Sequence, residues 1–139
     1  EELERLNIAR YERYAEVEAN ETMFEEYMMD DAEICIAAFG IAARVSKNAI
    51  NEARKEGIKV GMIRPITLWP FPKAPFVKAA EHCSSIISVE LSMGQMIEDI
   101  KLATEFKVPV TPYNRTGGIL PDVYEVLDVI EKAAKGGKN

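Results

Sequence analysis

Few residues of this chain belong to the types that do chemistry, and they do not form a known catalytic pattern. Glu90 follows an apolar segment, where a carboxylate would point into the crevice at the edge of a sheet. A lone glutamate there more often binds a loop or a helix N-terminus than acts as a general base, and no second carboxylate, serine–histidine pair or lysine supports it. His82, the one histidine, falls at the end of an expected helix, where its cationic form meets the negative end of the helix dipole. We therefore predict no catalytic residue in the chain itself.

The two cysteines do not indicate a metal site. Cys35 and Cys83 are far apart in the chain, whereas metal ligands usually occur as closely spaced pairs. Cys35 lies inside an apolar run, where a buried and unreactive thiol is the usual outcome. Two such thiols fit a reducing compartment, so the sequence favours the cytoplasm.

Two glycine-containing turns are candidates for binding an anion through backbone N–H groups. Gly40 follows the apolar segment 34–39, but Ile41-Ala42-Ala43 comes next, so the glycine-rich dinucleotide fingerprint is absent and a tight turn is the simpler interpretation. The turn Arg115-Thr116-Gly117-Gly118 could present N–H groups to an anion, and an ordinary turn explains it equally well. Neither turn is assigned a cofactor.

The most distinctive stretch of the sequence is Arg64-Pro-Ile-Thr-Leu-Trp-Pro-Phe-Pro72, a stiff apolar loop with three prolines. Trp69 and Phe71 either pack on the core of the chain or lie against a partner, where buried aromatic residues act as anchors. We favour contact with a partner.

Short apolar segments alternate with longer amphipathic ones from residue 34 onward. The segments 34–39, 58–63, 85–89 and 108–111 predict buried strands. Helices are predicted after Gly40 to residue 56, over 72–81, from Met93 to Ala103, and from Pro121 onward. Ser92 and Gln95 have the spacing of a capping box, in which the hydroxyl and the amide bond free backbone donors of the third helix.

This alternation predicts an α/β fold, a three-layer α/β/α sandwich with a mainly parallel sheet of four to five strands. In such sheets, ligands and partners bind beyond the carboxyl ends of the strands. The candidate surface for a partner or ligand therefore comprises Gly40, Arg64, Trp69, Phe71, Glu90, Gln95, Arg115, Gly117 and Gly118.

Three regions are expected. Residues 1–31 form a helix over 3–18 and a connecting segment, in which 23–28 is either a short edge strand or a helical turn. Residues 32–135 form the α/β domain, and residues 136–139 form a flexible tail. The sequence starts at Glu1 without a methionine, which suggests excision from a longer polypeptide.

Composition and charge exclude two classes of partner. The chain is 47% hydrophobic and 29% charged, as is usual for globular proteins. Residues 1–33 carry 12 acidic and 3 basic side chains, and the remaining residues are mixed in sign, so nucleic acid is not an expected partner. No apolar run approaches the roughly 20 residues that span a bilayer, so a membrane is not expected either.

The segment Gly57–Pro72 (GIKVGMIRPITLWPFP) resembles the alpha-type chain of 2-oxoacid:ferredoxin oxidoreductases. The segment Val89–Met96 (VELSMGQM) and the turn Arg115–Gly118 continue the resemblance in the same order, so that it spans residues 27–130. The domain that it resembles is the carboxy-terminal, transketolase-like domain, whose mixed five-stranded sheet includes one antiparallel edge strand. Residues 23–28 would be that strand. The family often has Ser or Thr after the first-strand glycine, and Ile41-Ala42 here weakens the case for an anion at Gly40.

The resemblance implies a function for the whole enzyme and a supporting role for this domain. The enzyme would decarboxylate a 2-oxoacid on thiamine diphosphate with magnesium, pass electrons through iron–sulfur clusters to ferredoxin, and transfer the acyl group to coenzyme A. The family places thiamine between other domains, and Glu90 is not its thiamine-activating glutamate. The domain itself would bind none of these cofactors, contact other domains, other subunits and further copies of itself, and be inactive alone.

Two alternatives stay open at this point. One is the equivalent domain of another thiamine-dependent enzyme, which shares the fold but uses a different electron acceptor. The other is a free-standing module that binds a nucleotide or coenzyme A, which would need a phosphate-binding loop.

Overall fold

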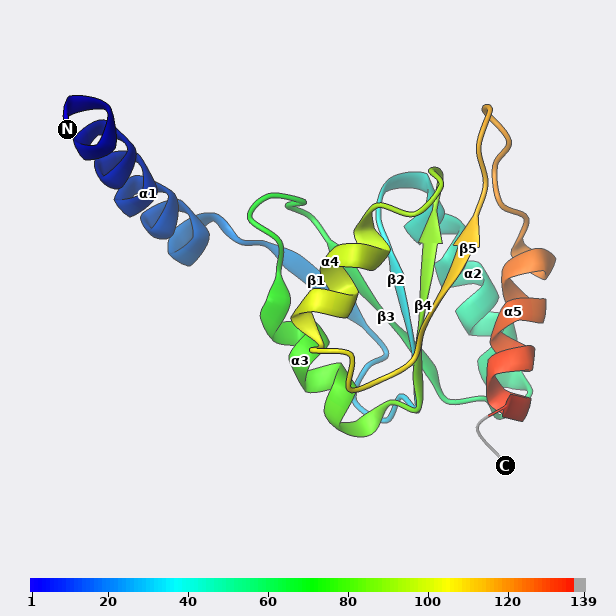
Figure 1. Cartoon of the computed structure of the whole chain (residues 1–139). Coiled ribbons are helices and arrows are strands. Elements are labelled where there is room, and N and C mark those ends of the chain that lie inside the picture. Colours follow the sequence, from blue (N-terminus) through cyan, green and yellow to red (C-terminus); the bar gives the residue numbers. More distant parts are fainter. Residues whose placement is uncertain (137–139) are drawn as a thin grey trace.

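The computed structural model describes residues 1–136 and contains five helices and five strands (Figure 1). In chain order these are α1 (Glu2–Glu21), β1 (Phe24–Tyr27), β2 (Ile34–Ala38), α2 (Gly40–Lys55), β3 (Val60–Pro65), α3 (Lys73–His82), β4 (Ser85–Glu90), α4 (Met96–Ala103), β5 (Val110–Asn114) and α5 (Val123–Gly136). The tail predicted for 136–139 starts at the last residue of α5, and its other residues, 137–139, lie outside the described residues. Within residues 1–136, no helix has the length and apolar character needed to cross a membrane.

The strands form one sheet in the order β1-β3-β2-β4-β5. Strands β3, β2, β4 and β5 are parallel, whereas β1 is antiparallel to β3, with Phe24 opposite Pro65 and Tyr27 opposite Met62. The structure therefore confirms the predicted mainly parallel sheet. It also confirms the segment 23–28 as the antiparallel edge strand that the family resemblance implied.

Helices cover both faces of this sheet. In the buried strand β2, Ile36 and Ala38 belong to a core cluster shared with α2 and α5, whereas Cys35 and Ala37 belong to a second cluster shared with α3 and α4. Figure 1 shows these two pairs of helices on opposite sides of the sheet. A strand covered on both faces requires apolar residues at every position, which is why its sequence shows no alternation. The predicted three-layer sandwich is confirmed.

Several predicted boundaries differ from the structure: strand 108–111 runs over Val110–Asn114, strand 58–63 over Val60–Pro65, and helix 3–18 over Glu2–Glu21. Two of the differences have local reasons. Strand β3 does not stop at Ile63 but continues to Pro65, because a proline at the end of a strand removes only a terminal donor from the ladder. Helix α5 begins at Val123 instead of Pro121, because the carboxylate of Asp122 accepts the backbone N–H of Tyr124 at 2.8 Å and thereby caps the helix.

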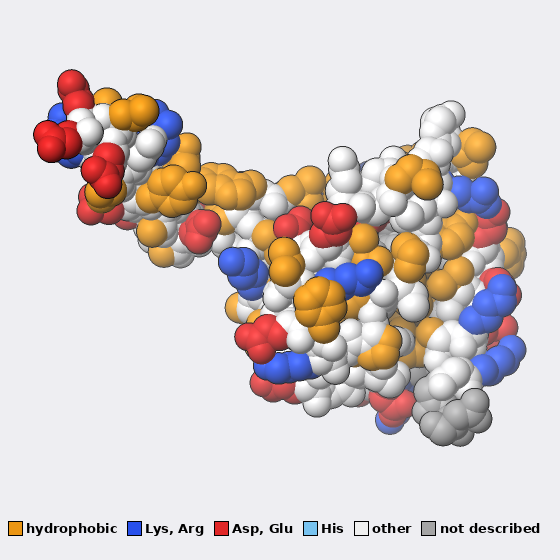
Figure 2. All heavy atoms as spheres, in the orientation of Figure 1, with side chains coloured by type: hydrophobic (Ala, Val, Ile, Leu, Met, Phe, Trp, Pro, Cys, Tyr) orange, Lys and Arg blue, Asp and Glu red, His pale blue; other side chains and the backbone are white. Residues whose placement is uncertain are grey.

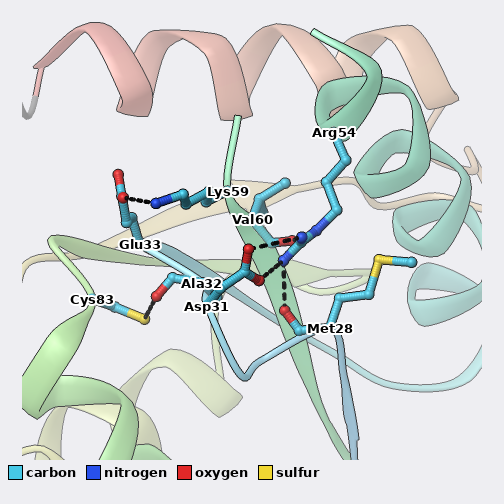
Figure 3. A network of polar contacts seen from close by, with 8 residues as sticks. All are labelled: Met28, Asp31, Ala32, Glu33, Arg54, Lys59, Val60 and Cys83. Atoms are coloured by element: carbon cyan, nitrogen blue, oxygen red, sulfur yellow. Dashed lines mark hydrogen bonds and ion pairs between the residues drawn. The ribbon is translucent and has the colours of Figure 1, made fainter. Parts of the chain in front are cut away.

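One arginine fixes the edge strand and the turn that follows it (Figure 3). Arg54 of α2 donates from Nη2 to the carbonyl oxygen of Met28 at 2.8 Å and to Oδ1 of Asp31 at 2.7 Å, and from Nε to the carbonyl oxygen of Val60 at 2.8 Å. The hydrogen bond from Arg54 also lowers the pKa of Asp31. Because the contacts of Arg54 with Met28 and Asp31 join residues far apart in sequence, no local pattern in residues 20–31 could indicate them.

The same turn leaves no room for a side chain on Gly61 of β3, and this predicts a large effect of a small substitution. A Cβ atom at Gly61 would lie 2.5 Å from the carbonyl oxygen of Met28 and 2.7 Å from Sδ of Met29. We expect Gly61→Ala to lower the free energy of unfolding by about 1–3 kcal/mol, the usual cost of overpacking. The matched control is Gly136→Ala, where a Cβ atom meets nothing within 4 Å and stability should be unchanged or slightly raised. Urea denaturation followed by circular dichroism measures both, and equal stability of the two variants would contradict the prediction.

Candidate functional site

The loops after the four parallel strands meet at one edge of the sheet, because parallel strands end on the same side. We call the surface formed by residues 39–41, 66–72, 91–95 and 115–122 the carboxyl-edge face; it lies at the top of Figure 1. Every residue of the predicted candidate surface belongs to one of these loops or to the strand end before it. The structure brings the predicted residues to one edge of the sheet, and their role as a surface for a partner or ligand stays a prediction.

The carboxyl-edge face is rich in exposed apolar side chains, most of which the sequence analysis missed. Its exposed large hydrophobic residues are Ile41, Ile66, Leu68, Trp69, Leu91, Met93, Ile119 and Leu120. Met93 is 81% exposed and Trp69 is 57% exposed. Hydrophobic side chains are visible along this edge in Figure 2. For Ile66 and Leu91 the signal in the sequence was an apolar residue just beyond the strand end, at a position where a solvent-exposed loop would ordinarily be polar.

The two aromatic residues of the proline-rich loop have different environments. Phe71 is half-buried and stacks on Phe76 of α3, with ring centroids 5.3 Å apart, so it packs on the core of the domain. Trp69 is exposed and meets the edge of Tyr14 of α1, with centroids 5.4 Å apart. Of the two predicted anchors, only Trp69 is exposed to a partner.

Glu90 ends β4 with a carboxylate that is only 2% exposed and that accepts five hydrogen bonds. Oε1 accepts from Ser88 Oγ at 2.7 Å and from the backbone N–H of Ile97 at 3.0 Å, and Oε2 accepts from Ser92 Oγ at 3.1 Å and from the backbone N–H groups of Gln95 at 2.8 Å and Met96 at 2.9 Å. The carboxylate therefore caps α4 and joins the strand, the loop and the helix. This confirms that Glu90 binds a helix N-terminus.

The capping box predicted at Ser92 and Gln95 is wrong. The Ser92 hydroxyl donates to Glu90, and Gln95 contributes its backbone N–H while its side chain is exposed. An ionised carboxylate accepts hydrogen bonds more strongly than a hydroxyl, so Glu90 takes the position that Ser92 would have filled. The helix consequently starts at Met96, and Met93, which was predicted to face inward, lies outside it.

The electrostatics of Glu90 favour a structural role. Burial alone would raise the pKa of Glu90, but the hydrogen bonds from Ser88 and from the N–H groups of Gln95, Met96 and Ile97 outweigh it, so the pKa is lowered. A general base needs an accessible lone pair and a pKa near the working pH. Glu90 has neither, since its oxygens are already occupied by donors.

A basic hollow lies beside Gly40, where φ is +58° and α2 begins. It is lined by Gly40, Ala43, Arg44, Lys47 and Arg64. Lys47 and Arg64 both pair with the carboxylate of Glu25, at 2.6 Å and 3.0 Å, and these hydrogen bonds lower the pKa of Glu25. The strand β1 therefore neutralises part of the charge of the hollow.

The loop after β5 is fastened to both neighbouring elements. The Arg115 guanidinium forms an ion pair with Glu125 of α5, and the backbone N–H of Arg115 donates to the carbonyl oxygen of Glu90 at 3.0 Å. Gly117 and Gly118 have φ of +66° and +80°, in the left-handed region that glycine tolerates best. Arg115 and Glu90 thus lie together, and the side-chain charge of Arg115 is directed to α5.

The described residues do not fit the metal ion and iron–sulfur clusters that the family resemblance implies. Residues 1–136 contain no group of three or more His, Cys, Asp or Glu side chains that could hold a metal ion. The chain has two cysteines, whereas iron–sulfur clusters usually take four thiolates. Both cysteines are buried, and burial raises the pKa of Cys35 and raises that of Cys83 to about 11. The described residues therefore offer no set of ligands for a cluster or a metal ion.

Comparison with known proteins points to one family. Residues 32–126 match the family model of pyruvate:ferredoxin oxidoreductase core domain II. The chain is 48% identical over 134 residues to ketoisovalerate oxidoreductase subunit VorB of Methanothermobacter marburgensis, an alignment that covers 96% of this chain and 38% of that protein. It is 32% identical over 101 residues to 2-oxoglutarate synthase subunit KorA of the same organism, covering 73% of this chain and 27% of that one. The chain thus spans less than two-fifths of the length of these curated relatives.

Two solved structures share the fold. A 2-oxoglutarate:ferredoxin oxidoreductase from Magnetococcus marinus superposes with a TM-score of 0.82 over 94% of this chain and 23% of that one, at 23% identity. A split gene transketolase, described as an inactive beta4 tetramer, superposes with a TM-score of 0.69 over 81% of this chain and 41% of that one, at 16% identity. At these identities the likeness concerns the fold alone, and it confirms the transketolase-like architecture.

The capping role of Glu90 predicts a pH-dependent stability. Because its folded-state pKa is lowered, Glu90 contributes stability that is fully present above its ordinary value of 4.5 and is lost as the pH falls through the lowered pKa. We expect Glu90→Gln to lower the free energy of unfolding at pH 7 by about 2 kcal/mol, the scale of hydrogen bonds to a charged group, and to reduce its dependence on pH below 4.5.

The matched control for this prediction is Glu105→Gln. Glu105 is exposed, and within residues 1–136 its one ion pair is with Lys107. Its substitution by Gln removes the same charge as Glu90→Gln. Its effect on the free energy of unfolding should be much smaller than that of Glu90→Gln. Urea denaturation at several pH values measures both variants, and an equal loss in the two would show that net charge, not the cap, accounts for the effect.

Proposed function

The chain belongs to the family of pyruvate:ferredoxin oxidoreductase core domain II, and we propose that it is the carboxy-terminal assembly and support domain of an alpha-type 2-oxoacid:ferredoxin oxidoreductase subunit. The observation that carries this proposal is the exposed apolar carboxyl-edge face. A catalytic or cofactor site usually combines an apolar pocket with a few converging polar groups. Here the carboxylate of Glu90 is satisfied by five donors of the protein itself, and eight large apolar side chains of the face remain exposed.

The proposed role of the carboxyl-edge face is to contact neighbouring domains and subunits. Interface cores are depleted in charged residues and enriched in aromatic residues and Met. Trp69 and Met93, both exposed on this face, fit that composition. The loops around them are held in place by the Glu90 cap and by the Arg115–Glu125 ion pair. A surface that is fixed before binding loses less conformational entropy on association. These features suit a domain that supports others, and contacts with a second copy of the chain are part of the same proposal.

The chemistry of the whole complex is proposed from the family. In the cytoplasm the complex would oxidise a 2-oxoacid to an acyl-coenzyme A and transfer the electrons to ferredoxin. Thiamine diphosphate with magnesium would supply the decarboxylation and iron–sulfur clusters the electron transfer, each held by residues outside this chain. The relatives are named for different 2-oxoacids, ketoisovalerate and 2-oxoglutarate among them, so the proposal extends only to the class of substrate.

A second candidate function rests on the basic hollow beside Gly40. Arg44, Lys47 and Arg64 bring three cations to the amino end of α2, a place suited to the phosphates of a nucleotide or coenzyme A. Glu25 competes for two of these cations, and no second glycine or hydroxyl follows Gly40. The assembly role therefore has the stronger support.

The assembly role predicts that a charge on the carboxyl-edge face disrupts the complex without unfolding the domain. We would introduce Met93→Glu and Ile119→Glu into the subunit co-expressed with its partner subunits. Both residues are exposed, so the circular dichroism of the domain should not change, whereas the assembled fraction should fall about tenfold or more, because a charge would be buried at the interface. Size-exclusion chromatography with light scattering and 2-oxoacid-dependent ferredoxin reduction measure the two effects.

The matched control for the assembly variants is Phe106→Glu. Phe106 is 69% exposed and precedes β5, at the opposite edge of the sheet. It should leave assembly and activity unchanged. Normal assembly of both carboxyl-edge variants would contradict the proposal.

Calorimetry on the chain alone separates the two candidate functions. The assembly role predicts no heat of binding with thiamine diphosphate, coenzyme A or common nucleotides, and no 2-oxoacid oxidation by the isolated chain. Micromolar binding of coenzyme A or a nucleotide that Arg44→Glu abolishes would instead establish the basic hollow as a phosphate site.

A further inference from the structure

Within residues 1–136, helix α1 contacts the rest of the molecule only near its carboxyl end, where Tyr14 meets Trp69. It projects away from the sheet in Figure 1, and none of its 20 residues is buried. Helices in proteins owe most of their stability to packing of one face, and an exposed helix of this length is only marginally stable on its own. An α1 that stays helical therefore requires a surface to cover it. This surface is separate from the carboxyl-edge face, so the inference does not depend on the proposed function.

One face of α1 combines apolar residues with carboxylates. A shallow hollow along the helix is lined by Glu1, Leu3, Glu4, Asn7, Ile8, Tyr11, Glu12 and Ala15. Leu3, Ile8 and Tyr11 are 72%, 57% and 71% exposed. Ile8 and Tyr11, three positions apart, lie one above the other on one face, whereas Leu3 lies at the edge of the same hollow. The three arginines of α1 are absent from this lining. Figure 2 shows acidic, hydrophobic and basic side chains together at the exposed end of the helix.

We propose that this face of α1 binds a partner helix whose apolar side is flanked by lysine or arginine. The apolar side of the partner would cover Leu3, Ile8 and Tyr11, as ridges of one helix pack into grooves of another. Its basic flanks would pair with the carboxylates of Glu4 and Glu12. Charge complementarity of this kind selects partners and excludes wrong ones.

The charge of α1 argues against a second copy of the chain as the occupant. Two such faces packed together would bring like carboxylates opposite one another, which is unfavourable. The segment 1–33, with its 12 acidic and 3 basic residues, continues the acidic character beyond the hollow. A helix with basic flanks is the occupant that this electrostatic field attracts.

The chain contains its own reporter for occupancy of α1. Tyr11 lies on the proposed face and contacts Tyr14, with ring centroids 5.7 Å apart, and Tyr14 contacts Trp69 with centroids 5.4 Å apart. Trp69 is the only tryptophan of the chain. A helix that binds over Tyr11 therefore changes the surroundings of Trp69 through one intervening ring, and its binding is detectable by intrinsic fluorescence.

The test uses two synthetic amphipathic peptides with the same leucine face, one flanked by lysine and the other by glutamate. Trp69 fluorescence and the anisotropy of labelled peptide give the dissociation constants with the full chain. We expect the lysine peptide to bind about tenfold more tightly than the glutamate peptide, since two or three exposed ion pairs have that combined effect, and to weaken as salt is added. The double variant Glu4→Lys, Glu12→Lys should reverse the preference.

The matched control is the double variant Glu2→Lys, Glu16→Lys, which changes the net charge of α1 equally but alters residues outside the hollow. It should keep the preference for the lysine peptide. Equal binding of both peptides, binding of neither, or a reversal by the control as large as that by the test variant would overturn the proposal. So would a stable dimer of the wild-type chain that Ile8→Ser abolishes, because a second copy would then cover the face.

Discussion

The buried carboxylate of Glu90 is the interaction on which the functional edge of this fold depends. Helix α2 leaves β2 toward one face of the sheet and α4 leaves β4 toward the other, so the crevice between them is the place where parallel α/β sheets usually bind ligands. In this chain the N-terminus of α4 is already occupied by Glu90, whose two oxygens accept five donors from a strand, a loop and a helix. The anion site of the crevice is thus filled by the protein itself. The N-terminus of α4 is therefore not available to a ligand. The hydrogen bonds of Glu90 instead fix the loop before α4 relative to β4.

The hydrogen bonds of Glu90 determine the conformation of the surrounding loops. With Glu90 bonded to the backbone of Arg115 on one side through its carbonyl oxygen and to α4 on the other through its side chain, the last two loops of the sheet are fixed relative to each other. Leu91, Met93, Ile119 and Leu120 are the large apolar side chains of these loops that remain exposed to a partner. Desolvating apolar side chains on a rigid support favours association, whereas the same loops lack a free base or nucleophile. These features support the proposed role of the domain in positioning its neighbours.

Most of the fold followed from local patterns, whereas the details of the site did not. Apolar runs such as 34–39 identified the buried strands, and the family resemblance added the antiparallel edge strand at 23–28. The start of α4 was missed because Ser92 and Gln95 satisfy a pattern of four residues, while the true cap comes from Glu90, seven residues before Ile97, by way of an irregular loop. Arg54 and Trp69 illustrate the same limit: their partners Met28 and Tyr14 are fixed by tertiary packing, for which a single sequence holds no signal. The exposure of Met93 was likewise invisible, because an apolar residue in a helical register predicts burial.

The molecule presents two surfaces of different chemistry, and the difference has a physical consequence. The carboxyl-edge face is apolar, so it gains free energy from burial but discriminates poorly between apolar partners. The α1 face adds a row of carboxylates to a narrower apolar strip, and long-range electrostatics act before contact is made, orienting a partner of opposite charge. Trp69 lies between the two, on a loop of the carboxyl-edge face and against Tyr14 of α1. A partner bound to α1 would therefore lie beside the carboxyl-edge face. The carboxylates of α1 would select this partner, and burial of the apolar carboxyl-edge face would add to its affinity.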